Sequence, residues 1–141
     1  MENDADLVVP NLWLGNKYAA CNENFIQTNQ IRCIINVSLN IPNCFDFYNI
    51  KYLRIPVENR LKDICIFQSF LDTSYKLIDE CLEKGEGILV HCKRGHRRSV
   101  MVVTYYLMKK YKLDYDEVKN YIKCARPSAF KCPIYLKAAF I

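Results

Sequence analysis

The chain reads Gly87-Ile-Leu-Val-His-Cys-Lys-Arg-Gly-His-Arg-Arg-Ser-Val-Met-Val-Val-Thr-Tyr-Tyr-Leu107, a short apolar run, a basic loop and a longer apolar run. Residues 87–91 are typical of a central parallel strand, which is buried on both faces. The run from Arg98 to about Tyr111 is apolar nearly all round and predicts a buried helix. A helix that begins there directs its positive end at the preceding loop.

The loop holds a cysteine and an arginine six positions apart, Cys92 and Arg98, with Gly95 between them and Ser99 after them. The backbone N–H groups of residues 93–98 can converge on one anion. Such a field favours a thiolate, so we expect a depressed pKa for Cys92. The planar guanidinium of Arg98 can hold two phosphoryl oxygens, and Ser99 can hydrogen-bond the sulfur. The spacing predicts a thiolate that attacks phosphorus.

His91, Cys92, Gly95, Arg98 and Ser99 together resemble the signature of the cysteine-dependent protein phosphatases, and specifically their dual-specificity branch. The resemblance implies hydrolysis of phosphotyrosine and of phosphoserine or phosphothreonine in proteins through a cysteinyl-phosphate intermediate. It also implies that His91 sets the pKa of the thiolate and that neither a metal nor a cofactor takes part.

Segments outside the loop carry the same resemblance, so it covers nearly the whole chain. They are residues 8–16, 31–38, 52–57 and the turn 126–128. In the family, the asparagine that matches Asn36 ties its strand to the phosphate loop. The alternative is that Asn36 satisfies local backbone groups at the end of a strand.

The order of the predicted elements indicates an α/β fold. We expect a central, mostly parallel sheet of about five strands flanked by helices, as in protein-tyrosine-phosphatase-like dual-specificity domains. An amphipathic helix is predicted over residues 67–82 and ends near Gly85, a capping box at Asp114 and Glu117 starts another, and a last helix begins at Pro133. We expect a single domain over residues 1–141.

The segment that carries the family's general acid departs from the family pattern. The family places an aspartate about thirty residues before the cysteine, and this chain has Asn59 at that position. Asparagine cannot donate the proton, so Glu58 or Asp63 is a substitute acid, or the step proceeds without one. The alternative is that both are ordinary carboxylates, with Asp63 capping the following helix.

The basic run of the loop leaves the substrate open. Lys93, Arg94, Gly95, His96, Arg97 and Arg98 are the predicted phosphate-binding residues. The start Cys-Lys-Arg-Gly also resembles phosphatases of inositol pyrophosphates, and basic loops recur in phosphoinositide phosphatases and RNA 5'-triphosphatases. A small polyanion is therefore the alternative to a phosphoprotein, and a merely solvated basic face is the simplest reading. Nucleic acid is not expected as a partner except as a 5'-triphosphate substrate.

The change at Asn59 also keeps open a phosphopeptide-binding pseudophosphatase with weak turnover. A nucleic-acid-binding module would account for the basic loop and the tyrosines, but not for the spacing from Cys92 to Arg98.

Composition and cysteine positions indicate the cellular compartment in which the protein is expected. The chain has 141 residues and a formal net charge of +5. Its eight cysteines lack the close spacing of a zinc site, and the acidic start does not look like a signal peptide. The longest apolar stretch is too short to span a membrane. We therefore expect reduced thiols and a cytoplasmic protein, with the nucleus left open.

Overall fold

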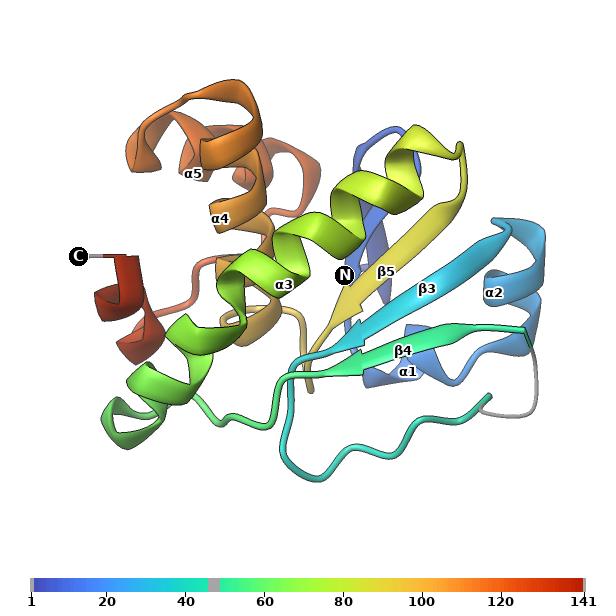
Figure 1. Cartoon of the computed structure of the whole chain (residues 1–141), viewed down its shortest axis with the longest axis horizontal. Coiled ribbons are helices and arrows are strands. Elements are labelled where there is room, and N and C mark those ends of the chain that lie inside the picture. Colours follow the sequence, from blue (N-terminus) through green and yellow to red (C-terminus); the bar gives the residue numbers. More distant parts are fainter. Residues whose placement is uncertain (1, 46–48, 141) are drawn as a thin grey trace.

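The structure, a computed structural model, describes residues 2–45 and 49–140 and contains a five-stranded sheet covered by helices on both faces (Figure 1). The strand order is β1-β2-β5-β3-β4. The strands are β1 (Ala5–Val9), β2 (Leu12–Gly15), β3 (Ile31–Asn36), β4 (Lys51–Arg54) and β5 (Gly87–His91). The predicted architecture, with about five strands and a mostly parallel sheet, is confirmed.

All pairings in the sheet are parallel except the hairpin β1–β2. β5 lies at the centre between β2 and β3, and its five residues are all buried. This burial explains the near-continuous apolar sequence of β5, because a central parallel strand meets protein on both faces. The carboxyl ends of β2, β3, β4 and β5 therefore lie at one edge of the sheet, which is where ligand sites of open α/β sheets lie.

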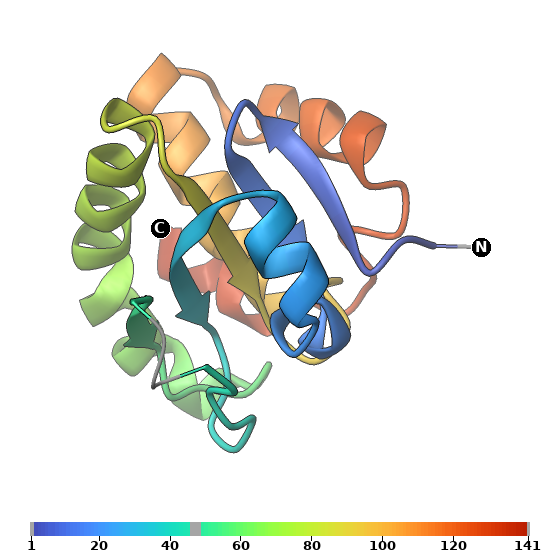
Figure 2. The same cartoon turned by 90° about the vertical axis from the view of Figure 1, so that its right-hand side faces the viewer.

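The helices divide between the two faces of the sheet (Figure 2). The larger cluster packs α3 (Ile64–Glu83), α4 (Arg98–Tyr111), α5 (Tyr115–Ala125) and the 3₁₀ helix η2 (Tyr135–Phe140) against one face. The smaller cluster packs α1 (Lys17–Ala20) and α2 (Glu23–Thr28) against the other. A 3₁₀ turn, η1 (Leu61–Asp63), precedes α3. Successive residues of β5 alternate between the clusters: Ile88 and Val90 join the larger, and Leu89 joins the smaller.

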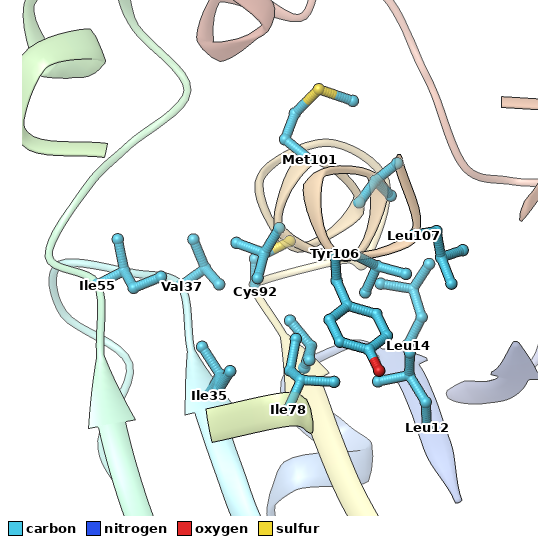
Figure 3. Close-up of a cluster of buried hydrophobic side chains, with 14 of the residues drawn as sticks. Leu12, Leu14, Ile35, Val37, Ile55, Ile78, Cys92, Met101, Tyr106 and Leu107 are labelled. Atoms are coloured by element: carbon cyan, nitrogen blue, oxygen red, sulfur yellow. The ribbon is translucent and has the colours of Figure 1, made fainter. Parts of the chain in front are cut away.

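The larger core extends to the end of β5, where Cys92 lies beside Val37 (Figure 3). The chain leaves the core at this point and turns into the start of α4. Buried packing on several sides thus fixes the position of the cysteine before any polar contact is considered.

The predicted helix limits agree closely with the structure. The capping box is present, since the Asp114 side chain accepts from the N–H of Glu117 and the Glu117 side chain accepts from the N–H of Asp114. On α5, Tyr121 is half exposed and donates its hydroxyl to the carbonyl of Val8. The last helix is a 3₁₀ helix from Tyr135 rather than one that begins at Pro133.

The expectation that the cysteines are all reduced is wrong for one pair. Cys21 and Cys44 form a disulfide, with their Cα atoms 5.6 Å apart. They are 23 residues apart in sequence, and tertiary packing brings them within the range that a disulfide spans. Six others are free: Cys33, Cys65, Cys81, Cys92, Cys124 and Cys132. No helix in the described part of the chain is long and apolar enough to cross a membrane.

Candidate active site

Eight of the predicted site residues lie together at the carboxyl end of β5, around the loop of residues 92–97 that leads into α4. A hollow of about 430 Å³ opens there. It is lined by Glu58, Asn59, Cys92, Lys93, Arg94, His96, Arg97 and Arg98. A larger hollow of about 540 Å³ lies away from Cys92, and its walls between β1, α4 and α5 are mainly apolar. The polar hollow is the one with the chemistry of an active site.

Cys92 is almost fully buried at the floor of this hollow, with its Sγ 3.1 Å from the Oγ of Ser99. Burial opposes ionisation of the thiol. The positive charge of Arg98, the Ser99 hydroxyl and the backbone N–H groups of Ser99 and Gly95 outweigh it, so the pKa of Cys92 lies below its ordinary value. The depressed pKa expected from the sequence is confirmed, with Arg98 as the largest favourable contribution.

The loop turns its carbonyl groups away from the hollow. The carbonyl oxygens of four consecutive residues, 93–96, each accept a hydrogen bond from another part of the chain. The donors are Lys17 N to Lys93 O, Arg126 Nη2 to Arg94 O, Arg126 Nε to Gly95 O and Phe130 N to His96 O, at 2.9 to 3.2 Å. A peptide group whose carbonyl points outward points its N–H inward, so this arrangement produces an anion-binding concavity.

Arg126 is the residue of the site that the sequence analysis missed. Its side chain is fully buried, and besides the two loop carbonyls it donates to the carbonyl of Asn3 and to the carboxylate of Asp6. The only sequence signal for Arg126 was the segment 126–128, which the sequence analysis interpreted as a turn. Gly95 completes this support, because its φ is +71° and a Cβ there would lie 2.6 Å from the carbonyl oxygen of Gly15.

The two histidines contact different partners. His91 is buried, and its Nδ1 lies 3.2 Å from the carbonyl oxygen of Cys92. Desolvation, with the charges of Arg54 and Arg98, lowers the pKa of His91 to about 4, so the ring is neutral at pH 7. Its contact is with the backbone of Cys92 rather than with the sulfur. His96 is buried and its Nε2 lies 2.9 Å from a carboxylate oxygen of Glu2.

The three candidates for the general acid have separate environments. The Asn59 amide donates to the carbonyl of Pro133 and its oxygen accepts from the N–H of Tyr135, at 2.8 and 3.0 Å. Asp63 is buried and accepts from the backbone N–H of Glu58 and from Nε of Arg60.

Desolvation works against ionisation of Asp63, but the Arg60 and Glu58 hydrogen bonds prevail and hold its pKa below the ordinary value. Asp63 is also the residue that precedes α3, yet its side chain makes no capping bond to that helix. Glu58 is the carboxylate that lines the hollow together with Cys92.

The basic side chains of the loop differ in their contacts and in their exposure. Arg97 donates from Nε to the carbonyl of Lys131 and from Nη2 to that of Cys132, so it anchors the chain before η2. Lys93 and Arg94 are exposed at the rim of the hollow. Arg98 is partly buried, donates to the carbonyl of Val57, and also lines the hollow.

Asn36 supports a loop other than the one that the resemblance implied. Its Nδ2 donates to the carbonyl of Ile41 and to Oδ1 of Asn43, and its Oδ1 accepts from the Ser38 hydroxyl at 2.5 Å. The tie to the phosphate loop runs instead through backbone, since Val37 N donates to the carbonyl of His91. These contacts fit the alternative better, in which the Asn36 side chain hydrogen-bonds to local groups at the end of its strand.

Comparison with known proteins agrees with this geometry. The family model described as "Dual specificity phosphatase, catalytic domain" matches residues 12–137. Dual specificity protein phosphatase 1-A of Xenopus laevis is 34% identical over 120 residues, which are 84% of this chain and 31% of that protein. Dual specificity protein phosphatase 1B of Arabidopsis thaliana is 27% identical over 139 residues, 96% of this chain and 81% of that protein.

Among solved structures, human DUSP28 superposes with a TM-score of 0.87 at 26% identity, covering 99% of this chain and 93% of that one. DUSP15 superposes with a TM-score of 0.84 at 29% identity, covering 96% and 84%. The chain spans about a third of the length of the first curated relatives that it matches.

Proposed function

This chain belongs to the dual specificity phosphatase family, and from that premise we propose that it hydrolyses phosphate monoesters on tyrosine, serine and threonine residues of proteins. The observation that carries the proposal is the loop of residues 92–98. Four of its carbonyls are bonded outward, its amides face one hollow, and a thiol with a depressed pKa lies at the floor. A phosphoryl group fits this arrangement of charge and donors.

In the proposed mechanism the Cys92 thiolate attacks phosphorus, so an S–P bond forms as the bond to the leaving oxygen breaks. Arg98 and the loop amides hold the three equatorial oxygens while negative charge spreads over them. A water then attacks the cysteinyl phosphate, inorganic phosphate leaves, and the Ser99 hydroxyl donates to the departing thiolate. Neutral His91 acts as a positioning residue through the backbone of Cys92.

We assign the general acid to Glu58. Asn59 is held by the η2 segment and Asp63 is held ionised by Arg60, so neither has a proton to give. Glu58 is half-buried and lines the hollow that contains Cys92. Its carboxylic acid would protonate the leaving oxygen in the first step and take a proton from water in the second.

A non-protein polyanion, such as an inositol pyrophosphate, a phosphoinositide or an RNA 5'-triphosphate, is the second candidate substrate. Exposed Lys93 and Arg94 at the rim favour it, because they add two positive charges beside the phosphoryl site. Arg97 does not contribute in the same way, since its side chain is engaged with backbone carbonyls.

A substrate panel tests the proposal. Phosphotyrosine and phosphothreonine peptides, inositol phosphates and triphosphate-ended RNA would be compared by kcat/KM, and the phosphoenzyme would be trapped by rapid acid quench and located by mass spectrometry. We expect turnover of the phosphopeptides and a phosphoryl group on Cys92. Phosphopeptide binding without turnover or phosphoenzyme would establish a pseudophosphatase instead, and preferential turnover of a polyanion would establish the second candidate.

A further inference from the structure

Two free cysteines, Cys33 and Cys81, lie side by side in the larger core although they are 48 residues apart in sequence. Cys33 is on β3, and Cys81 is in the last turn of α3, the helix that packs on that face of the sheet. Their sulfur atoms are 2.6 Å apart, about half an ångström more than the disulfide bond length of about 2.05 Å. A bond between them therefore needs little movement of strand or helix.

A hollow of about 180 Å³ opens onto this pair from the surface, and both cysteines lie in its wall. The other charged groups of the wall are three cations and two carboxylates: Arg32, Lys51, Lys84, Glu80 and Glu86. Each cysteine is nearly buried, with exposed fractions of 5% and 3%, so the hollow is the route by which a small molecule reaches the sulfurs. The excess of positive charge favours an anionic reagent.

The two thiols differ in their tendency to ionise. The hydrogen bond from the Cys81 thiol lowers the pKa of Cys33, against the effects of burial and of Glu86, and the charges of Lys51 and Lys84 act in the same direction as that bond. The same hydrogen bond, together with burial, raises the pKa of Cys81. Cys33 is therefore the thiolate that attacks first, and Cys81 is the thiol that reacts second.

This pair is separate from the cysteine of the candidate active site. Cys33 is in register with Ile88 near the start of β5, and Cys92 follows the end of that strand, four residues further along. At about 3.3 Å per residue the two levels are about 13 Å apart, beyond the Cα separation of about 7 Å that a disulfide spans. Oxidation of the pair therefore leaves the Cys92 thiol unbonded.

A metal ion fits the pair less well than a covalent bond does. Two thiolates on one tetrahedral metal ion lie about 3.8 Å apart, since each metal–sulfur bond is about 2.3 Å long. In the described part of the chain, no group of three or more His, Cys, Asp or Glu side chains could hold a metal ion. The short distance between the sulfurs thus favours disulfide chemistry.

We propose that Cys33 and Cys81 are a site of reversible oxidation, at which a small-molecule disulfide enters the hollow and converts the pair to a disulfide. The Cys33 thiolate attacks one sulfur of the reagent, whose S–S bond breaks and releases a first thiol. Cys81 gives its proton to solvent and attacks the Cys33 sulfur of the mixed disulfide, which releases the second thiol. The protein loses two electrons and two protons, and the reagent gains them. The new bond fastens α3 to β3 and does not depend on the proposed phosphatase function.

The test uses the Cys92→Ser variant, so that the proposed nucleophile does not compete for the oxidant. The folded protein is equilibrated with mixtures of reduced and oxidised glutathione, free thiols are alkylated, and peptides are identified by mass spectrometry. Digestion with trypsin and chymotrypsin separates Cys33 from Cys44, because chymotrypsin cleaves after Leu39. We expect a peptide pair linked through Cys33 and Cys81. Thiols that stay free in fully oxidised glutathione, or a link from Cys33 to a different cysteine, would overturn the site.

Single variants in the same background test the order of the two steps. Cys81→Ala should retain glutathione on Cys33, whereas Cys33→Ala should carry at least about tenfold less glutathione on Cys81. Cys65→Ala is the matched control, because it removes an exposed cysteine of the same helix and should leave the linked peptide unchanged. Equal glutathione on Cys33 and Cys81 in the two variants would overturn the assignment of Cys33 as the attacking thiol.

Melting temperature tests the bond in the folded protein. Reduction also opens the Cys21–Cys44 disulfide, so the quantity compared is the difference in Tm between the oxidised and the reduced protein, with and without Cys81→Ala. We expect Cys81→Ala to decrease this difference by about 5–10 °C, because the bond closes a long loop. An unchanged difference would overturn the proposed bond. Cys33→Ala provides the same measurement if Cys81→Ala does not fold, and the peptide analysis requires neither variant.

Discussion

The phosphate loop, residues 92–98, lines the same hollow as the first two residues of the acid segment, residues 58–63. The two segments are held in different ways. The loop is held by its backbone, with carbonyls bonded outward to Lys17, Arg126 and Phe130, so its N–H groups stay available. The acid segment is held by its side chains, and those of Asn59 and Asp63 are used in the holding. The backbone N–H groups of a site can thus stay available for an anion while most side chains of the neighbouring segment are used in hydrogen bonds that hold that segment.

The largest effect is expected from Cys92→Ser, which tests the loop half of the comparison. A serine hydroxyl is not ionised in a field that ionises a thiol, so turnover should fall below about a hundredth of wild type. Binding of a phosphate analogue such as vanadate or tungstate should persist, because the loop amides and Arg98 remain. Steady-state kinetics and calorimetry measure the two properties. Residual turnover above a tenth of wild type would remove Cys92 from the role of nucleophile.

Arg126→Gln tests whether the outward bonding of the loop carbonyls matters for catalysis. We expect a loss of about ten- to a hundredfold in kcat/KM, since small displacements of a reacting geometry are that costly. Because Arg126 also pairs with Asp6, Asp6→Asn is the control that loosens the guanidinium without removing its donors to the loop. Equal kcat/KM in Arg126→Gln and wild type, at equal melting temperature, would show that the loop keeps its conformation without the Arg126 hydrogen bonds.

Glu58→Gln tests the other half of the comparison. We expect a loss of about tenfold or more on a phosphothreonine peptide, whose leaving alkoxide needs protonation, and a much smaller loss on an activated aryl phosphate. The limb of the pH–rate profile that reports the acid should disappear with it. Loss of that limb in Asp63→Asn rather than in Glu58→Gln would transfer the role to Asp63.

Asn59→Asp should accelerate the reaction by no more than several-fold, although the family has an aspartate at this position. A carboxylate can accept from Tyr135 N, but it cannot donate to the Pro133 carbonyl. One of the two hydrogen bonds that hold the side chain of residue 59 would therefore be lost. Kinetics with phosphothreonine and activated aryl substrates measure the gain. A hundredfold increase in kcat/KM for the phosphothreonine substrate alone would mean that the new carboxylate of residue 59 leaves its partners and acts as the acid, as in the family.

The smallest effect is a pH dependence of stability that identifies Asp63 as structural. Its folded pKa lies below the unfolded one, so its stabilisation is present above the unfolded pKa of about 3.9 and is lost as the pH falls through the folded pKa. Asp63→Asn should therefore lower the melting temperature at pH 7, and the difference should shrink towards pH 3. A constant difference across that range would show that Asp63 does not act through its charge.

The loop and its surroundings could be predicted because their determinants are adjacent in sequence. The spacing of Cys92 and Arg98 and the apolar runs on either side define a strand, a turn and a helix, and the structure has β5 and α4 at those places. The capping box at Asp114 is local for the same reason. The roles of Asn36 and Asp63 were less predictable, since each side chain had several partners of equal chemistry within reach.

The sequence by itself determined which groups make up the proposed site: a thiol, a guanidinium and a run of backbone amides at fixed offsets, on a strand–loop–helix frame whose local backbone follows from short-range sterics and periodicity. Only the tertiary structure decided which groups stay free to act. Arg126 reaches the loop from 31 residues away, and Pro133 and Tyr135 engage Asn59 from 74 and 76 residues away. Lys17 N meets Lys93 O just beyond the ends of the neighbouring strands β2 and β5. A hydrogen-bonding side chain has no preference for partners near in sequence, so its partner is decided when distant segments pack.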